Sequence, residues 1–138
     1  MGVRSGHDLW DRRVWLFPSL IFCENVRREI QGLQVGDPLL KQVVKRLLEI
    51  QNYCRGWNVG PFNPADLPFK ITGESEATMN QYSAERTFVV PDNNIALIFK
   101  LHGRLTPHTW RIYFEPVRPG SMYIGYIGPK LPTVEYPT

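Results

Sequence analysis

The spacing of the apolar residues changes along this chain, and that change constrains the fold more than any other feature. Between residues 24 and 53 the apolar side chains recur every three or four positions, which is the period of a helix. From residue 87 onward, strand-like runs of alternating side chains are separated by turn residues. Because most of the strands follow the helices instead of alternating with them, they predict an antiparallel sheet with the helices on one face.

Two helices are predicted in the first half of the chain. The first covers residues 24–33, which carry a single apolar stripe at helical spacing. The second begins after Asp37, a good N-cap residue, with Pro38 in the first helical position, where a missing amide hydrogen costs nothing. It is expected to run to about Tyr53, since its apolar and charged residues separate onto opposite faces up to that point.

Strands are predicted on both sides of the helical pair. One strand precedes it, in the β-branched and aromatic run of residues 14–22. The strands that follow the helices are expected at residues 87–90, 95–102, 110–117 and 122–128. The predicted fold class is therefore α+β: a strand, a two-helix hairpin, and then an antiparallel sheet of about four strands with the helices packed on one face.

The length of 138 residues is typical of one domain, so residues 1–138 are expected to form a single domain. Within it we expect an N-terminal arm at residues 1–13 and an extended, proline-punctuated tail at residues 129–138. Residues 55–86 are expected to be a long irregular insertion, because they are rich in glycine and proline and too long for a plain connection.

The cysteine content favours a protein of the cytoplasm. The formal net charge of +3 is compatible either with ordinary solubility or with a polyanion partner. Cys23 and Cys54 lie in apolar surroundings, so we expect buried thiols of a reducing compartment instead of a disulfide. The first residues lack the apolar core of a signal peptide, and the longest apolar run, residues 14–23, is shorter than the ~20 residues that cross a bilayer. No association with a membrane is expected.

Polar side chains from two predicted strands are expected to converge on the sheet face turned away from the helices. In residues 95–102 and 110–117, apolar side chains occupy one set of alternate positions and mostly polar side chains the other. The predicted catalytic residues are Lys100, His102, Arg111 and Tyr113, and the predicted substrate-binding residues are Arg104 and His108 in the loop between the strands.

This set of residue types is suited to a phosphodiester. Arginine makes bidentate contacts with phosphate, lysine stabilises developing negative charge, and histidine or tyrosine can move a proton to or from a ribose 2′-hydroxyl. Such a reaction needs no metal, and the chain carries no metal-ligand or nucleotide-binding motif, so neither a metal nor a cofactor is predicted. The alternative is a solvated sheet face whose charges only keep the protein soluble.

Two further features are given structural interpretations. Glu74 and Glu76 stand two positions apart in a polar segment, and we expect them to belong to a solvated loop instead of forming an acid–base pair. Gly125 leaves a gap in the last strand beside Tyr123, which we expect to receive a large neighbour such as Trp110 or Tyr113.

The order of elements resembles that of the RelE/ParE toxin superfamily, which has a strand, two helices and then an antiparallel sheet. The family often shows a strand with the pattern R-x-x-Y/F, matched here by Arg111-Ile112-Tyr113-Phe114, followed by an apolar strand ending in glycine, matched by Tyr126-Ile127-Gly128. The resemblance implies a metal-independent endoribonuclease toxin that acts on RNA or on the ribosome. It also implies an antitoxin partner that covers the sheet or the basic site.

A second hypothesis makes the chain a non-catalytic protein-interaction module, such as an accessory subunit of a bacterial-type cytoplasmic complex. A module of this kind needs an exposed apolar patch, which we expect from Trp57, Phe62 and Phe69. The enzyme needs its polar residues within reach of one phosphate-sized volume instead.

Overall fold

Four helices and seven strands make up the fold in the computed structural model, which describes residues 2–105 and 109–136. The helices are α1 (Gly6–Leu16), α2 (Asn25–Ile30), α3 (Pro38–Gly56) and α4 (Glu76–Tyr82), with short 3-10 turns η1 (Pro64–Asp66) and η2 (Ser83–Arg86). The strands are β1 (Leu20–Phe22), β2 (Thr72–Gly73), β3 (Thr87–Val89), β4 (Ala96–Ile98), β5 (Leu101–Leu105), β6 (Trp110–Arg118) and β7 (Ser121–Pro129). The α+β class predicted from the sequence is confirmed.

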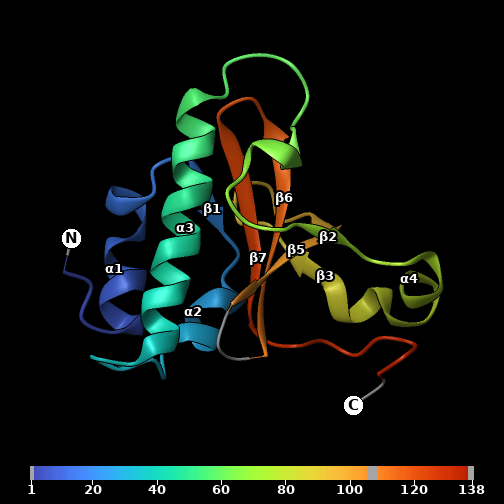
Figure 1. Cartoon of the computed structure of the whole chain (residues 1–138), viewed down its shortest axis with the longest axis horizontal. Coiled ribbons are helices and arrows are strands. Elements are labelled where there is room, and N and C mark those ends of the chain that lie inside the picture. The colour runs from blue at the N-terminus through green and yellow to red at the C-terminus, as the bar shows by residue number, and fades with distance from the viewer. Residues whose placement is uncertain (1, 106–108, 137–138) are drawn as a thin grey trace.

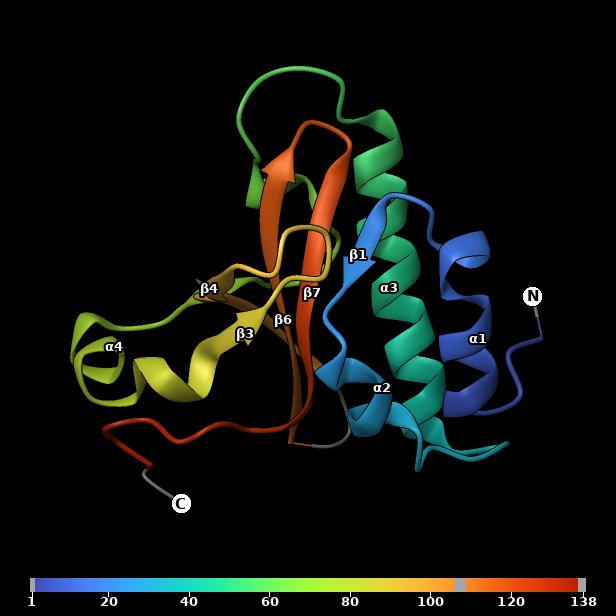
Figure 2. The ribbon, with the colours of Figure 1, turned by 180° about the vertical axis from the view of Figure 1, so that it is seen from behind.

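The main sheet has five strands in the order β1-β7-β6-β5-β2. Strand β1 pairs with β7 in parallel and the other neighbours are antiparallel, so the sheet is mixed where the sequence predicts an antiparallel one. Strands β3 and β4 form a separate antiparallel pair. Helices α1, α2 and α3 gather on one side of β6 and β7, and α4 lies on the other side with the β3–β4 pair (Figures 1 and 2).

Helix α3 confirms the helix predicted after Asp37. The Asp37 carboxylate accepts a hydrogen bond from the Leu39 amide at 2.9 Å, and Pro38 occupies the first turn. The helix continues to Gly56, and its apolar stripe packs into the core against β5 and β7. Its partner α2 is shorter than predicted and covers only Asn25–Ile30.

The N-terminal region differs from its prediction. Residues 1–13 are not an arm and residues 14–22 are not one strand, because helix α1 spans the boundary between them and leaves β1 only three residues. Ser5 caps the helix by accepting a hydrogen bond from the Asp8 amide at 3.1 Å. Leu9 and Trp10 are buried in the core. The helix therefore gains both a cap and an apolar face, which together outweigh the strand propensity of the residues that follow.

The strand predicted at residues 95–102 breaks at Phe99. Its first part is β4, which pairs with β3, and its last part is β5, which continues to Leu105 into the predicted loop and joins the main sheet. At the break, the Phe99 amide donates to the Arg86 carbonyl at 2.8 Å and the Phe99 ring is fully buried. Burial of this ring compensates for the interrupted strand.

A bulge in β7 receives the Phe99 ring. Between Tyr113 and Phe114 the pairing of β6 with β7 shifts by one residue at Gly125. A Cβ atom on Gly125 would lie 2.7 Å from the Phe99 ring, so only glycine leaves enough room there. The packing interpretation of Gly125 is therefore correct, but its neighbour is Phe99 and not Trp110 or Tyr113.

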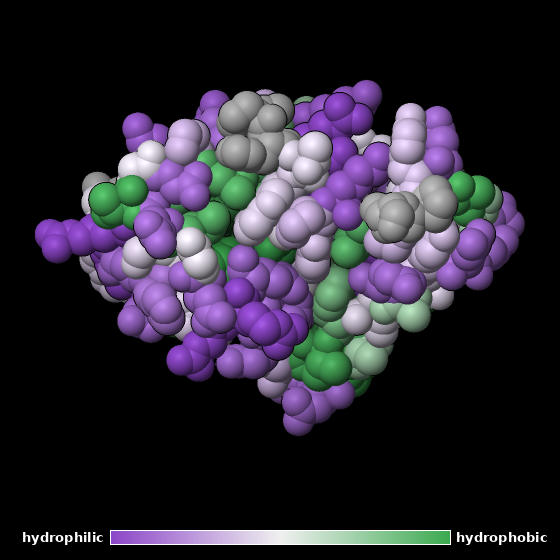
Figure 3. Space-filling view, turned by 90° about the horizontal axis from the view of Figure 1, so that it is seen from below, coloured by the Kyte–Doolittle hydropathy of each residue, from purple (hydrophilic) through white to green (hydrophobic). Residues whose placement is uncertain are grey.

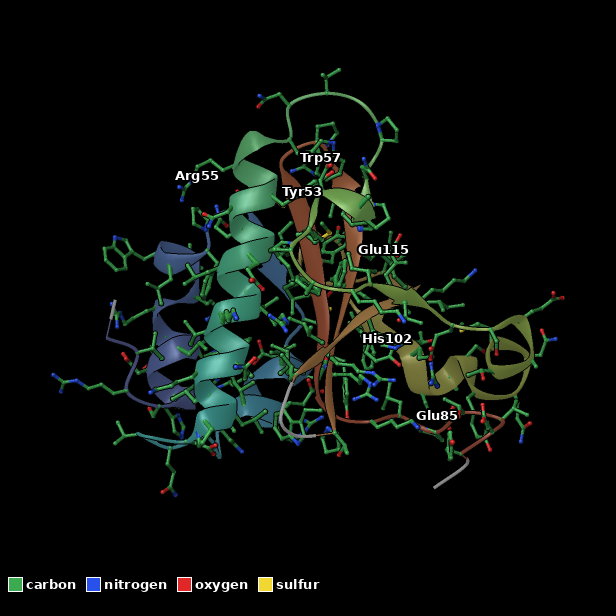
Figure 4. The ribbon with its side chains drawn as sticks, in the orientation of Figure 1. Tyr53, Arg55, Trp57, Glu85, His102 and Glu115 are labelled. Atoms are coloured by element: carbon green, nitrogen blue, oxygen red, sulfur yellow. The ribbon has the colours of Figure 1, made fainter. Side chains whose placement is uncertain are left out.

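The aromatic residues of the predicted insertion do not form an exposed patch. Trp57 is buried, and the Phe62 and Phe69 rings both lie edge-on to the buried Phe114 ring at centroid distances of 6.2 and 6.3 Å. Tyr53 and Trp57 mark this cluster at one end of α3 (Figure 4). The patch expected for an interaction module is thus part of the core, because an irregular segment of this length needs anchoring side chains.

Neither cysteine is paired with the other in the structure. Cys23 and Cys54 are buried free thiols, and burial raises the pKa of Cys23 to about 12 and that of Cys54 to about 11. Their thiolates are therefore scarce at neutral pH, and both act as small core residues. Within the described residues, no helix has the length and hydropathy required to span a membrane.

Glu29 joins α2 to β7 and predicts a pH-dependent stability. One carboxyl oxygen accepts the Ile127 amide at 2.9 Å and the other accepts the Asn25 side-chain amide at 2.7 Å. Burial raises the Glu29 pKa from 4.5 to about 7 despite these hydrogen bonds. The folded state therefore holds this proton more tightly than the unfolded state, and Glu29 costs stability as pH rises from about 4.5 to 7.

As pH rises from 4.5 to 7, we expect the free energy of unfolding of Glu29→Gln to increase by about 1–3 kcal/mol relative to that of the parent, since the amide cannot ionise. Urea unfolding at several pH values measures this difference. Glu24→Gln is the control, because the Glu24 side chain is 75% exposed and its replacement should leave the pH dependence unchanged. Parallel stability curves for the parent and Glu29→Gln would contradict the prediction.

Candidate functional site

A pocket of about 650 Å³ opens where β5 and β6 meet α4 and the segment after β7. Its floor comes from β5 and β6, one wall from the start of α4, and the other wall from the C-terminal segment (residues 130–136). This segment is tied to α4 by a hydrogen bond from the Val134 amide to the Thr78 hydroxyl at 3.3 Å. The pocket thus has a cover formed by the far end of the chain, and the surface at this end is mostly hydrophilic (Figure 3).

The side chains of Glu74, His102 and Tyr113 meet on the pocket floor. The Tyr113 hydroxyl donates to Glu74 Oε2 at 3.0 Å, and His102 Nδ1 lies 3.4 Å from Glu74 Oε1. The His102 and Tyr113 residues are register partners, so their rings stack with centroids 4.8 Å apart. The Glu74 side chain is only 6% exposed and that of His102 12%, so the reactive groups are shielded from bulk water and reached through the pocket.

Behind Glu74 lies the buried guanidinium of Arg86. Arg86 is at the end of η2 and is 0% exposed. Its Nε donates to Glu74 Oε2, and its Nη1 donates to the Tyr82 carbonyl at 3.3 Å. Each charge compensates the other, because a buried carboxylate or a buried guanidinium without a partner would destabilise the fold.

Two arginines stand side by side on the pocket wall. Arg104 and Arg111 are register partners on β5 and β6, and both line the pocket. Arg104 is exposed, whereas Arg111 is nearly buried and donates to the Trp110 carbonyl at 3.1 Å. Burial lowers the Arg111 pKa, and the neighbouring positive charge of Arg104 lowers it further. Neither guanidinium forms an ion pair with a described residue, so both can bind an anion in the pocket.

The environment gives the two rings of the floor different protonation behaviour. Burial lowers the His102 pKa below its ordinary 6.5, while the negative charge of Glu74 opposes that shift. Burial and Glu74 both raise the Tyr113 pKa far above its ordinary 10. At neutral pH the imidazole is therefore a neutral base and the phenol keeps its proton.

Four of the six predicted site residues come together in this pocket: His102, Arg104, Arg111 and Tyr113. Lys100 does not, because it lies two residues before His102, in the break between β4 and β5, where it is exposed and outside the pocket lining. It lies near Glu115 instead, whose pKa burial raises and Lys100 lowers. Figure 4 shows His102 on the side of the strands that faces α4, with Glu115 farther along β6. His108 lies outside the described residues.

The sequence-based prediction of site residues does not include Glu74, Arg86 or Lys130. Glu74 is not in a solvated loop. It follows the two-residue strand β2, whose Thr72 pairs with His102, and this pairing brings the Glu74 carboxylate to within 3.4 Å of His102. Arg86 supports it, and Lys130 lines the pocket just after β7. Glu76 remains exposed, as expected. No periodic pattern marks a two-residue strand, so only the fold reveals Glu74 as a site residue.

The chemistry available to this pocket is acid–base chemistry beside an anion site. Among the described residues, no group of three or more histidine, cysteine or acidic side chains is arranged to hold a metal ion. Two arginines and Lys130 can hold an anionic group, and the Glu74–His102 pair can move a proton next to it. Comparisons of this chain with protein-family models, with curated proteins and with solved structures find no match.

Proposed function

We propose that the chain is a metal-independent endoribonuclease that cleaves an RNA phosphodiester in this pocket. One observation carries the proposal: a buried Glu74–His102 pair lies in the same pocket as two arginines without ion-pair partners among the described residues. The first feature suits proton transfer and the second suits a phosphate. Together they form the set of groups that a phosphodiester cleavage without a metal requires.

Substrate binding would begin at the arginine pair. Like charges on directly opposite strand positions destabilise a sheet, so Arg104 and Arg111 have a cost in the free protein. A phosphate between them turns that repulsion into two charge-assisted contacts. RNA is the preferred substrate over DNA because the reaction below uses the 2′-hydroxyl.

In the proposed reaction, His102 Nε2 takes the proton from the ribose 2′-hydroxyl. The 2′-oxygen attacks the phosphorus, the bond from phosphorus to the 5′-oxygen breaks, and a 2′,3′-cyclic phosphate forms. Glu74 Oε1 lies 3.4 Å from the other ring nitrogen, which has no hydrogen-bond partner among the described residues, so the carboxylate would stabilise the imidazolium by its charge. The departing 5′-oxygen takes a proton from the Lys130 ammonium, and the arginines stabilise the charge on the phosphate oxygens.

The biological context that we propose is that of a RelE-like toxin acting in the cytoplasm, on RNA or on the ribosome, and neutralised by an antitoxin. The pocket is compatible with such control, since a partner that covers the C-terminal segment or the arginines would block it. The free buried thiols also fit a reducing compartment. An expression assay tests this part of the proposal: we expect the parent to arrest growth and a folded, catalytically inactive variant not to.

A cleavage assay on a short RNA in the presence of EDTA tests the chemistry. We expect cleavage with a 2′,3′-cyclic phosphate end, identified by mass spectrometry, and no cleavage where the attacking 2′-hydroxyl is replaced by hydrogen. Intact RNA after incubation with folded protein, with and without added ribosomes, would refute the proposal.

Removing the exposed arginine tests the phosphate contact. We expect Arg104→Gln to raise KM by about 10- to 100-fold, because a charge-assisted hydrogen bond contributes about 1.5–3 kcal/mol. Arg118→Gln is the matched control, since Arg118 is exposed at the turn between β6 and β7 and does not line the pocket. Equal KM values for the two variants would exclude Arg104 from substrate binding.

A second candidate function is the non-catalytic interaction module, on a surface other than the one expected. Val14 and Trp15 at the end of α1 are 70% and 76% exposed, which is unusual for adjacent large apolar residues. This face would serve a protein partner or a larger complex. Loss of partner binding in Trp15→Ala, with no RNA cleavage by the parent, would favour this function.

A further inference from the structure

Arg86 does not line the pocket, yet its Nε is directed to Glu74 on the pocket floor. It is fully buried, its Nε donates to Glu74 Oε2, and its guanidinium carbon lies 5.8 Å from the centroid of the Tyr113 ring. Its Nη2 has no hydrogen-bond partner among the described residues. A buried cation with an unpaired donor is costly, so stability alone does not account for its presence.

The backbone on both sides of Arg86 fixes this cation in place. Its Nη1 donates to the Tyr82 carbonyl at the end of α4, and its own carbonyl accepts the Phe99 amide at the break between β4 and β5. The end of α4 therefore holds the Arg86 side chain, and the break between β4 and β5 holds its backbone. A group positioned this firmly can impose its geometry on Glu74.

The Glu74 carboxylate has two oxygens with two separate tasks. Oε2 accepts from Arg86 and from the Tyr113 hydroxyl, which leaves Oε1 as the oxygen that faces His102. Without Arg86, Oε2 would keep only the Tyr113 hydroxyl as a partner, and the carboxylate would no longer be held with Oε1 toward His102.

We propose that Arg86 is a positioning residue that holds Oε2 of Glu74 and so turns its Oε1 toward His102. This inference deepens the proposed function, because it assigns control of the acid–base pair to a residue outside the pocket. The charged and titratable groups that act on His102 are Glu74 from the segment before α4, Arg86 from η2, and Arg111 and Tyr113 from β6. Of the two members of the buried pair, Glu74 has the larger effect on the imidazole and raises its pKa, whereas Arg86 lowers it.

The sign of one shift therefore separates a positioning role from a purely structural one. In Arg86→Met we expect the His102 pKa to fall, because Glu74 Oε1 is no longer held toward the imidazole and the larger effect of Glu74 is lost together with that of Arg86. If Glu74 kept its position without Arg86, the pKa of His102 would rise instead, because only the repulsion from Arg86 would be lost. NMR titration of the imidazole protons measures the shift, with the His102 signal assigned by its absence in His102→Asn.

Two more variants keep the test decisive if Arg86→Met does not fold. The double variant Arg86→Met/Glu74→Gln buries no charge, and we expect its His102 pKa to lie below that of the parent. A value equal to or above the parent's would overturn the inference, because it would mean that Glu74 is not held where it acts on His102. Arg86→Lys keeps the charge, so we expect it to keep the parent's His102 titration.

The cleavage assay gives the second measurement. We expect Arg86→Met to lower kcat by at least about 10-fold with KM changed by less than about 2-fold, and Arg86→Lys to restore part of the loss. An unchanged kcat in folded Arg86→Met would exclude a role in the reaction. Because the titration needs no substrate, a parent that cleaves no RNA but titrates as expected would refute the proposed function and leave the positioning of Glu74 intact.

Discussion

Replacing His102 with alanine is expected to lower RNA cleavage by about 100- to 10,000-fold, the usual contribution of a positioned general base. His102 lines the pocket, and one of its ring nitrogens faces Glu74, which leaves the other to accept the proton of the 2′-hydroxyl. The loss should fall on kcat more than on KM, since the arginines that hold the phosphate remain. Single-turnover cleavage measurements would quantify it.

His7→Ala is the matched control, because His7 is exposed on α1 on the far side of the sheet from the pocket. We expect parent-like cleavage from this variant and parent-like thermal unfolding from both. A folded His102→Ala variant that keeps more than about a tenth of the parent's activity would exclude His102 as the base.

The pH dependence of cleavage by the parent should also reflect the protonation of His102. Burial lowers the His102 pKa from its ordinary 6.5, and the base must be neutral to accept a proton. We therefore expect kcat/KM to stay level between pH 6.5 and pH 8 and to fall at more acidic pH. A profile that falls already between pH 8 and pH 7 would require a base with a raised pKa, contrary to the burial of His102.

The strand pattern alone places most of the pocket floor correctly. Alternation assigns His102 and Tyr113 to one face of neighbouring strands, and the structure makes them register partners with stacked rings. The rule also assigns Arg111 to this face, whereas Arg104, predicted in the loop, lies opposite Arg111 because β5 extends to Leu105. These successes depend only on local periodicity and on two long strand segments being neighbours.

Glu74 and Arg86 show where sequence reasoning ends. They are 12 positions apart, and neither belongs to a periodic apolar pattern that would indicate which way its side chain points. Glu74 reaches the site through a two-residue strand, and Arg86 through a 3-10 turn closed by the Phe99 amide. Such contacts follow from long-range packing, which a local spacing does not encode.

The Phe99→Ala substitution is expected to cause the largest loss of stability, about 3–5 kcal/mol. Phe99 is fully buried, its ring contacts that of Phe88 edge-on at a centroid distance of 5.8 Å, and it fills the space left by the bulge at Gly125. Urea unfolding at constant pH measures the loss. We expect Phe99→Leu to lose less, because leucine leaves a smaller cavity.

A double-mutant cycle shows whether Phe99 and Gly125 act as one packing unit. In the parent, Gly125→Ala should cost about 1–3 kcal/mol, since the nearest atoms to the added Cβ all belong to the Phe99 ring. In the Phe99→Ala background that clash is gone, so the same substitution should cost less than about 0.5 kcal/mol. Additive losses would contradict the packing of Phe99 into the bulge. They would also remove the reason for the strand break that holds Arg86, and with it Glu74, in place.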